Sequence, residues 1–463
     1  MKILLIYPKN VDTYYRDEPY PPLGLLYLAA YARDMGYSDI KILDCVVDGI
    51  SQDSLYNEIA MSDIIGVGGF TSQFKHAIEI SRICKELNKP SVCGGVHVSS
   101  DPAGCLKASE FDIAVKGEGE VTFYELLKLY SNKDRCDLKG IDGLLYKSNG
   151  GVVENKNRAA IENLDSLSYP ARDLLDMGKY KIRDEFYSSF FTIIQSTRGC
   201  PFECTFCNSP KMWHRKMRAR SAQHLVSEMS ELYHRYGFRC VHISDDGFTY
   251  RRDVVKETCS LIIEKGLDIE WACVSRPELV DAELLQLMRK SGCIRISIGV
   301  ESADLKIIEQ AKKRYSLKKI AESAELIKKS GILLHCYMMI GLPGETLRTY
   351  WKSIAFMRKI KPDRVGWAVV VPYPGTELFE KKMVDIVNRD YLNWGGYLNP
   401  VIKVGLMQPV FLRILQLLAN FLTQKRYQKR SLFVSLTLAF SVYLPGYLSQ
   451  SVSRRLRKLI TNR

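Results

Sequence analysis

The sequence has no acidic residue after Asp390, although the chain continues to residue 463. Residues 401–463 hold eleven Lys or Arg and no Asp or Glu, so this tail supplies most of the net charge of +14. The rest of the chain is close to neutral. A protein that binds nucleic acid with its whole surface carries a broad basic patch, so we expect no nucleic-acid partner.

The sequence also lacks a secretory signal, because Pro8 ends the short apolar run of MKILLIYPKN. Its 13 cysteines are an odd number, and disulfide frameworks belong mainly to exported domains. We therefore expect reduced thiols or metal ligation, and a cytoplasmic location. With 46% hydrophobic and 25% charged residues the chain is not disordered, and its length suggests about three structural units.

Short apolar segments alternate with amphipathic ones over residues 1–150. We predict strands at residues 3–7, 40–43, 64–67, 91–93 and 112–115, and helices at 23–35, 52–61, 74–88 and 121–130. This alternation predicts an α/β domain with a parallel, doubly wound sheet of the flavodoxin-like (Rossmann) type. Ligands of such sheets bind beyond the carboxyl ends of the strands.

Glycine-rich loops follow several of these strands, where a ligand would bind. Glycine lets the backbone approach a large ligand closely, although one such loop alone would only indicate a tight turn. The candidate ligand contacts are Pro22, Gly24, Gly68, Gly69, Thr71, Gly94, Gly95, His97, Gly117 and Glu118.

These loops resemble the cobalamin-binding domain at the front of many radical SAM enzymes, in the phrases PPLGLLYLAAYARDMGY, ILD, GGVHVSSDP and KGEGE. The resemblance implies that residues 1–150 bind cobalamin. Val46 stands where other cobalamin proteins carry the His of Asp-x-His-x-x-Gly. Valine cannot coordinate a metal, so we expect no His ligand to cobalt from this loop. His97 is a candidate for polar contact with the corrin or its tail.

A competing interpretation is a methylthiotransferase, whose N-terminal domain holds a second iron–sulfur cluster on three cysteines. Cys45, Cys84 and Cys93 are available for such a cluster. However, residues 7–10 after the first strand contain no cysteine, and Cys84 lies inside a predicted helix. We therefore favour cobalamin.

The most specific motif follows a predicted connector at residues 151–190. A strand at residues 191–195 leads into STRGCPFECTFCN, in which Cys200, Cys204 and Cys207 have the spacing Cys-x3-Cys-x2-Cys. Three thiolates this close can hold three irons of a cubane cluster and leave the fourth iron open. Three free buried thiols are one alternative. A zinc site is another, but zinc requires a further ligand, and the nearest His is His214.

This motif closely resembles the radical SAM signature, with Phe206 and the preceding strand included. The resemblance implies a 4Fe-4S cluster whose open iron binds S-adenosyl-L-methionine (SAM). A one-electron reductant such as flavodoxin or ferredoxin would drive cleavage of SAM to a 5′-deoxyadenosyl radical. The residues expected to contact SAM are Phe206, Asp245, Asp246, Arg276, Glu301 and Gly341.

Six strand–helix units are predicted over residues 191–400, with strands at 191–195, 241–243, 270–275, 294–300, 333–340 and 365–371. They predict a partial (β/α)6 TIM barrel with its site at the carboxyl ends of the strands. Asp245 and Asp246 follow the second strand, and carboxylates suit the SAM ammonium. Arg276 follows the third strand and could pair with the SAM carboxylate. Each of these residues could instead form an ordinary salt bridge.

Residues 401–463 form a basic, apolar tail that we predict to be helical. Residues 406–422 carry one charge, residues 431–453 carry none, and basic clusters flank the second stretch. Basic residues near apolar segments favour contact with an anionic membrane surface. Pro445 lies within the uncharged stretch and would interrupt a helix that spans a membrane. The alternative is a soluble helical cap that packs on the barrel.

The resemblance covers residues 1–400 and implies one of two reactions. The first is methylation of an unactivated carbon of a small or lipid-like substrate. The second is an oxidative cyclisation or rearrangement, as in the anaerobic Mg-protoporphyrin ester cyclase. We favour methyl transfer because it is the commoner use of this cofactor pair. We expect the protein to be free in the cytoplasm or bound to the inner face of the membrane. A cobalamin-binding sensor is the non-enzyme alternative, which the intact Cys200, Cys204 and Cys207 argue against.

Overall fold

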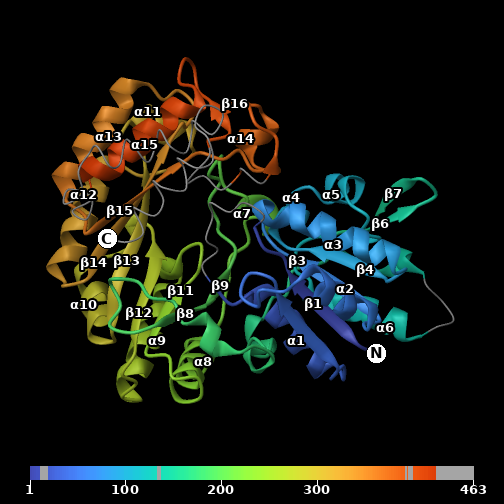
Figure 1. Ribbon diagram of the computed structural model, residues 1–463. Coiled ribbons are helices and arrows are strands. Elements are labelled where there is room, and N and C mark those ends of the chain that lie inside the picture. The colour runs from blue at the N-terminus through green and yellow to red at the C-terminus, as the bar shows by residue number, and fades with distance from the viewer. Residues whose placement is uncertain (11–18, 133–136, 392–393, 395–399, 424–463) are drawn as a thin grey trace, which may run out of the picture.

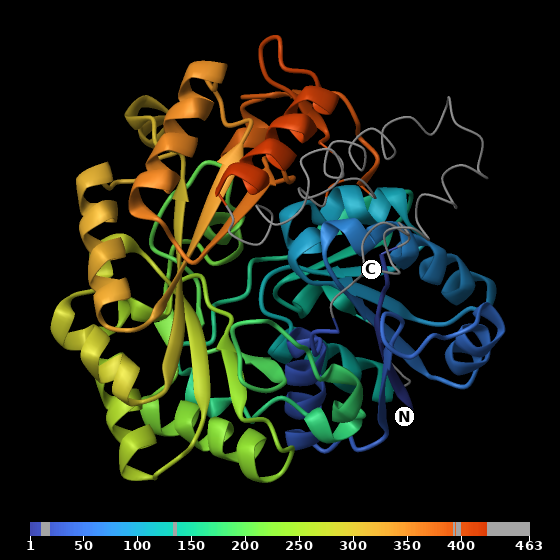
Figure 2. The ribbon, with the colours of Figure 1, turned by 60° about the vertical axis from the view of Figure 1, so that its left-hand side comes forward.

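Two parallel sheets, one from each half of the chain, lie side by side in the computed structural model (Figures 1 and 2). The structure describes residues 1–10, 19–132, 137–391, 394 and 400–423. The first sheet extends to residue 154, slightly beyond the boundary at residue 150, and the second spans residues 191–369. Our division into four segments remains a prediction.

The first sheet has the strand order β2-β1-β3-β4-β5-β6-β7. Its parallel strands are β1 (Ile3–Tyr7), β2 (Ile40–Asp44), β3 (Ile64–Gly68), β4 (Ser91–Gly94) and β5 (Ile113–Val115). This order confirms the flavodoxin-type sheet. Two antiparallel strands that were not predicted, β6 (Leu144–Ser148) and β7 (Gly151–Glu154), extend its edge.

Helices cover both faces of this sheet because its central strands are apolar on both sides. In β1, Ile3 and Leu5 pack into the core on one face, and Leu4 and Ile6 pack into the core on the other. Such continuous apolar strands are typical of parallel sheets. The helices are α1 (Leu23–Asp34) and α6 (Glu120–Ser131) on the first face, and α2 (Gln52–Ala60), α3 (Phe74–Glu86) and α5 (Pro102–Ala108) on the second.

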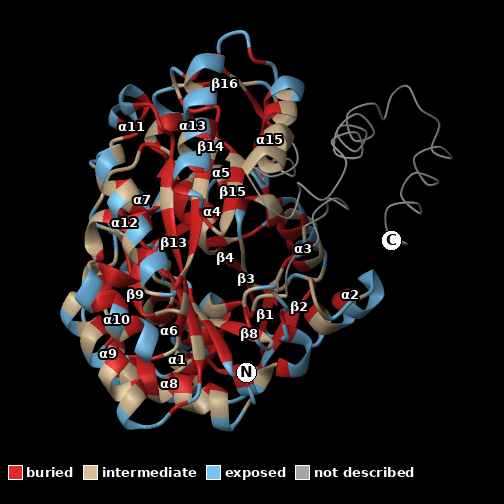
Figure 3. Ribbon diagram, turned by 90° about the vertical axis from the view of Figure 1, so that its left-hand side faces the viewer, coloured by how far each residue is buried: buried red, intermediate tan, exposed pale blue. Residues whose placement is uncertain are grey.

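The second sheet is parallel throughout, in the order β15-β14-β13-β12-β11-β8, and confirms the partial (β/α)6 barrel. Its strands are β8 (Phe191–Ile194), β11 (Cys240–Ile243), β12 (Glu270–Ser275), β13 (Cys293–Glu301), β14 (Leu333–Ile340) and β15 (Arg364–Val369). The outer helices are α8 (Ala222–His234), α9 (Arg252–Glu264), α10 (Ala282–Lys290), α12 (Leu317–Lys329) and α13 (Leu347–Ile360). Figure 3 shows the buried strands inside this exposed helical layer.

A short antiparallel hairpin joins the barrel to the first sheet. Strands β9 (Thr197–Arg198) and β10 (Arg218–Ala219) pair directly after β8 and enclose residues 199–217, which we call the cluster loop. The loop contains α7 (Ser209–Met212), and α7 contacts α4 (Val96–Ser100) of the first sheet (Figure 1). The hairpin was not predicted from the sequence, because its strands are only two residues long.

The beginning of the basic tail is a helix that packs on the barrel. Leu412, Leu415 and Ala419 of α15 (Pro409–Thr423) are buried. The Tyr350 hydroxyl donates a hydrogen bond to the Leu415 carbonyl at 2.8 Å, and the Gln416 amide donates to the Trp367 carbonyl at 2.7 Å. This part of the tail therefore forms a helical cap on the barrel, as in the alternative interpretation.

None of the helices in the described part of the chain is long and apolar enough to span a membrane. The second apolar stretch and the basic clusters of the predicted tail, from residue 424 onward, lie outside the described residues.

A buried ion-pair triad fixes helix α8 to the connector and the hairpin. Glu228 is fully buried and pairs with Arg172 at 2.6 Å and with Arg220. Burial raises the pKa of Glu228, but the two guanidinium groups outweigh burial and hold the pKa below its usual value. The stabilisation from this carboxylate is therefore present above about pH 5 and is lost as the pH falls, because an unfolded Glu gains a proton near pH 4.3.

We expect Glu228→Gln to lower the free energy of unfolding by about 3–5 kcal/mol, because it leaves two buried guanidinium groups without their counter-charge. Glu231→Gln on the same helix removes only the surface pair with Arg235 and should change the free energy by less than about 0.5 kcal/mol. Denaturant unfolding of both variants at pH 7 measures the difference. Equal effects of the two substitutions would contradict the role of the triad.

Candidate active site between the two sheets

Three of the twelve described cysteines differ from the others in exposure. Cys200, Cys204 and Cys207 are partly exposed, whereas the other nine are buried. The Cys200 sulfur lies 3.3 Å from the Tyr250 hydroxyl, and the Ser209 amide donates a hydrogen bond to the Cys207 sulfur at 3.4 Å. The cluster loop therefore presents three accessible thiols next to hydrogen-bond donors.

Two of these thiols keep their protons at neutral pH when no metal is bound. Burial raises the pKa of Cys207 to about 12 and also raises the pKa of Cys204, so metal binding would have to displace their protons. Within the described residues, no three His, Cys, Asp or Glu side chains converge as ligands of a single ion. A cubane needs no such convergence, because each of its three cysteines binds a different iron.

Arg276 lies beside the cluster loop with an unused donor. Its guanidinium carbon is 3.6 Å from the centre of the Phe202 ring, and its Nε donates a hydrogen bond to Glu278. The Nη2 atom is buried and has no hydrogen-bond partner. A buried donor without a partner costs free energy, so this atom is available to an acceptor on a ligand. The contact of Arg276 with the SAM carboxylate remains a prediction.

The two aspartates after β11 have different surroundings. Asp245 is buried and accepts hydrogen bonds from the Ser196 amide at 2.8 Å, the Thr197 amide at 3.0 Å and the Ser196 hydroxyl. This carboxylate stabilises the turn from β8 into β9, and the contact of Asp245 with SAM remains a prediction. Asp246 is exposed and accepts one hydrogen bond from Ser209 at 2.5 Å, so it retains acceptor capacity for the SAM ammonium.

Glu301 pairs with a lysine that sequence reasoning missed. The Lys313 ammonium lies 2.6 Å from the Glu301 carboxylate and 2.9 Å from the Gly299 carbonyl. Glu301 has a φ of 63°, a left-handed conformation that is rare for non-glycine residues and common at functional sites. Lys313 stands in a run of basic residues, 312–314. Such a run usually indicates a solvated surface, so this contact could not be predicted from the sequence.

Phe206 and Gly341 occupy different positions relative to the thiols. Phe206 is partly buried, and the Lys313 ammonium lies 5.8 Å from the centre of its ring. Gly341, with a φ of 90°, is packed against the C-terminal segment, because a Cβ atom there would lie 3.0 Å from Ile402. Its amide donates to the buried carboxylate of Glu345, whose pKa burial raises to about 8. Close packing explains the glycine, so its predicted contact with SAM remains a prediction.

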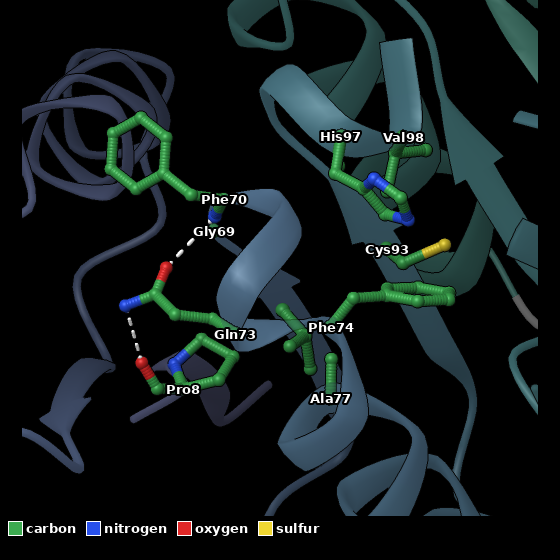
Figure 4. A pocket seen from close by; sticks show the side chains of 11 residues that line it. Pro8, Gly69, Phe70, Gln73, Phe74, Ala77, Cys93, His97 and Val98 are labelled. Carbon is green, nitrogen blue, oxygen red and sulfur yellow. Dashed lines mark hydrogen bonds between the residues drawn. The ribbon is translucent and has the colours of Figure 1, made fainter. Parts of the chain in front are cut away.

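The carboxyl edge of the first sheet, which we call the rim, contains an apolar hollow next to α3. Its lining comes from the ends of β1, β3 and β4 and from α3 and α4 (Figure 4). Gln73 stabilises the wall of the hollow with two hydrogen bonds. Its side-chain oxygen accepts one from the Phe70 amide at 2.8 Å, and its side-chain nitrogen donates one to the Pro8 carbonyl at 2.7 Å. The Phe70 side chain is 55% exposed at the edge of the hollow, so its ring is available for contact with a ligand.

The rim glycines predicted to contact a ligand have two different roles. Gly24 is exposed in the first turn of α1, and Gly117 has a φ of 79°; a Cβ atom at either position would meet no atom within 4 Å. Gly95 has a φ of 97°, and a Cβ atom there would lie 2.9 Å from the carbonyl oxygen of Gly69. Gly24 and Gly117 therefore leave room for a ligand, whereas Gly95 and Gly69 allow their two loops to come into contact. Pro22 caps α1, and Gly68 and Gly94 end β3 and β4.

His97 is almost fully buried, at 2% exposure, in the wall of the hollow. Its Nδ1 lies 3.1 Å from the Thr71 hydroxyl, and its ring packs between Phe74 and Tyr391 at 4.4 and 4.9 Å. Burial lowers its pKa to about 4, so the ring is neutral at pH 7. The neutral His97 ring and its aromatic neighbours make this part of the wall suitable for a neutral, apolar group of a ligand.

The cysteines of the methylthiotransferase interpretation do not form a second site. Cys45, Cys84 and Cys93 are buried in one apolar core of the first sheet. The loop that carries Val46 follows β2, and there Asp44 accepts hydrogen bonds from the Val46 amide at 2.9 Å and the Tyr180 hydroxyl at 2.8 Å. The absence of a His ligand to cobalt from this loop remains a prediction.

Four buried charged residues join the rim to strands β9 and β10, which form the stem of the cluster loop. We call these ion pairs the clamp. Arg198 of β9 pairs with Glu118 at 2.7 Å and with Glu120 at 2.6 Å, and Arg218 of β10 pairs with Glu118 at 2.7 Å. All four side chains are less than 10% exposed. Glu118 therefore connects the two sheets, and its role as a cobalamin contact remains a prediction.

Comparison with known proteins agrees with this architecture. Residues 194–357 match the Radical SAM superfamily and residues 13–127 match the B12 binding domain. An uncharacterized methyltransferase of Pyrococcus horikoshii is 33% identical over 417 residues, which cover 87% of this chain and 88% of that protein. The anaerobic magnesium-protoporphyrin IX monomethyl ester cyclase of Rubrivivax gelatinosus is 28% identical over 84% of this chain and 71% of its own length.

A solved structure shares the fold. The radical S-adenosylmethionine methyltransferase TsrM of Kitasatospora setae, with cobalamin and a 4Fe-4S cluster bound, covers 82% of this chain and 74% of its own chain, with a TM-score of 0.68 and 20% identity. The two sheets of this chain correspond to the two matched regions, the B12 binding domain and the Radical SAM superfamily. The chain belongs to the cobalamin-binding radical SAM family, and its cofactors are a 4Fe-4S cluster, SAM and cobalamin.

We expect Cys204→Ala to abolish iron binding after anaerobic reconstitution, because two thiolates cannot hold the cubane. Cys259→Ala, which changes a buried cysteine of α9, should keep the iron content of the wild type. Iron analysis and the absorbance of the reconstituted proteins test the difference. Full iron content in Cys204→Ala would show that the cluster is held elsewhere.

We expect Glu118→Gln to loosen the stem of the cluster loop, because Arg218 loses its charged partner and Arg198 keeps only Glu120. Hydrogen–deuterium exchange at residues 197–198 and 218–219 should become at least several-fold faster. Glu162→Gln removes an exposed pair with Lys216 of the same loop and should leave this exchange unchanged. Unaltered exchange in Glu118→Gln would refute the clamp.

Proposed function

We propose that the protein methylates an unactivated carbon of a small or lipid-like substrate, with cobalamin and SAM as cofactors. The observation that carries this proposal is the clamp of Arg198 and Arg218 on Glu118 and Glu120, because it fixes to the rim the two strands between which the loop with the three cysteines lies. A substrate between the two sheets would then face both cofactors at once. The relative from Pyrococcus horikoshii, described as a methyltransferase, supports the same activity.

We assign the residues as follows. Cys200, Cys204 and Cys207 hold three irons, and the partnerless Nη2 of Arg276 binds the SAM carboxylate. Asp246 receives the SAM ammonium, and Glu301, oriented by Lys313, receives a further polar group of SAM. When bound, the cofactors supply the electron, the 5′-deoxyadenosyl radical and the methyl group. The protein orients them and keeps bulk water from the radical.

The outer surface of the rim supports the assignment of the cobalamin site. The exposed ring of Phe70 and the open space beside Gly24 and Gly117 would accommodate a large, flat ligand there. The neutral ring of His97 would make a polar contact from the wall of the hollow. A role of His97 as a cobalt ligand has little support, because the ring is enclosed by Phe74 and Tyr391.

An oxidative cyclisation or rearrangement is the second candidate, because the cyclase of Rubrivivax gelatinosus shares 28% identity over most of the chain. A one-electron reductant such as flavodoxin or ferredoxin is required in either case. We retain the cytoplasmic location, and contact of residues 424–463 with the inner face of the membrane, as predictions.

Incubation of the reconstituted protein with methyl-labelled SAM, a low-potential reductant and a lipid extract distinguishes the candidates. We expect label in an organic product and formation of 5′-deoxyadenosine, with Cys204→Ala inactive in both. Deoxyadenosine without transferred label would favour cyclisation or rearrangement. Cobalamin binding with no cleavage of SAM would instead indicate a sensor.

A further inference from the structure

Tyr250, which follows Asp245 and Asp246 in the chain, contacts Cys200 of the cluster loop. The Tyr250 hydroxyl lies 3.3 Å from the Cys200 sulfur, within hydrogen-bond distance for sulfur. Either atom can be the donor while Cys200 carries a proton. A cysteine that holds iron is a thiolate, so the tyrosine hydroxyl would then be the only possible donor.

Several contacts hold this tyrosine in place. It ends a short 3-10 helix, Phe248–Tyr250, in which Phe248 packs edge-on against Trp271 at 5.6 Å. The ring of Tyr250 itself lies 5.7 Å from that of Phe202. A Cβ atom at Gly247 would lie only 2.5 Å from the Tyr250 ring. The glycine therefore leaves the space that the ring needs to reach Cys200.

We propose that the Tyr250 hydroxyl donates a hydrogen bond to the sulfur of iron-bound Cys200 and thereby raises the reduction potential of the cluster. A low-potential donor transfers one electron to the cluster, which becomes more negative by one charge. A hydrogen-bond donor at a ligand sulfur stabilises the more negative state. Tyr250 is thus a positioning residue that acts through Cys200, and this inference rests on the cluster that Cys200, Cys204 and Cys207 are assigned to hold.

Tyr315 provides a matched control in the same neighbourhood. The Arg276 guanidinium lies 5.6 Å from the centre of the Tyr315 ring and 3.6 Å from that of Phe202, the ring that also contacts Tyr250. The Tyr315 hydroxyl, however, donates to the Gly299 and Val300 carbonyls at 2.8 and 2.7 Å. Replacing Tyr315 with Phe therefore removes a buried hydroxyl near the cluster loop without removing a hydrogen bond to sulfur.

The test compares Tyr250→Phe, Tyr315→Phe and the wild-type full chain after anaerobic reconstitution with iron and sulfide. Iron content and absorbance are measured first, and the midpoint potential is then measured by redox titration monitored by electron paramagnetic resonance. We expect wild-type iron content in Tyr250→Phe and a more negative potential. At the wild-type midpoint, its ratio of reduced to oxidised cluster should fall about two- to tenfold, as expected for one lost hydrogen bond. Tyr315→Phe should keep the wild-type midpoint.

An unchanged midpoint in Tyr250→Phe, or an equal shift in Tyr315→Phe, would overturn the proposal. Loss of the cluster from the wild type would refute the proposed function instead, and the iron analysis separates the two failures. Should Tyr250→Phe fail to hold iron, Gly247→Ala provides a second variant, because it keeps the hydroxyl but displaces the ring from Cys200. A more negative potential in Gly247→Ala supports the proposal, and a wild-type potential overturns it.

Discussion

The relative position of the two sheets depends on charges that neither sheet could bury alone. Arg198 and Arg218 lie in the stem of the cluster loop, and Glu118 and Glu120 lie at the rim, all almost inaccessible to water. An isolated buried charge is strongly unfavourable, whereas a paired and hydrogen-bonded one is tolerated. Docking of the sheets and ordering of the cluster loop are therefore one process, and the distance between the two cofactor sites is set by ion pairs rather than by a flexible linker.

The topology of the two sheets places their candidate functional side chains in the space between them. Both sheets are parallel, so the loops that carry functional side chains gather at the carboxyl ends of the strands. On the first sheet these loops form an apolar hollow, and on the barrel they carry Arg276, Asp246 and Glu301. The contact between α4 and α7 closes the two sets of loops on each other. A large flat cofactor and a small charged one thus have adjacent, chemically different sites.

Sequence reasoning identified the elements whose signals are local. The strands of both sheets and the spacing of Cys200, Cys204 and Cys207 could be predicted because apolar periodicity and short motifs are visible within a few residues. The partners of charged side chains could not be predicted, because Glu118 and Arg198 are 80 residues apart. For the same reason, the hydrogen bonds of Asp245 to Ser196 and the pairing of Glu301 with Lys313 emerged only from the fold. The fold also decided that α15 packs on the barrel, which the sequence left as one of two alternatives.

The contact between Gly95 and Gly69 constrains how this rim can vary in evolution. A side chain at Gly95 would collide with the backbone of Gly69, and backbone, unlike a flexible side chain, cannot rotate aside. Neither loop can therefore drift independently of the other. Diversification for new ligands is open instead to positions such as Phe70, whose side chain projects from the rim and can be exchanged without moving the loops beneath it.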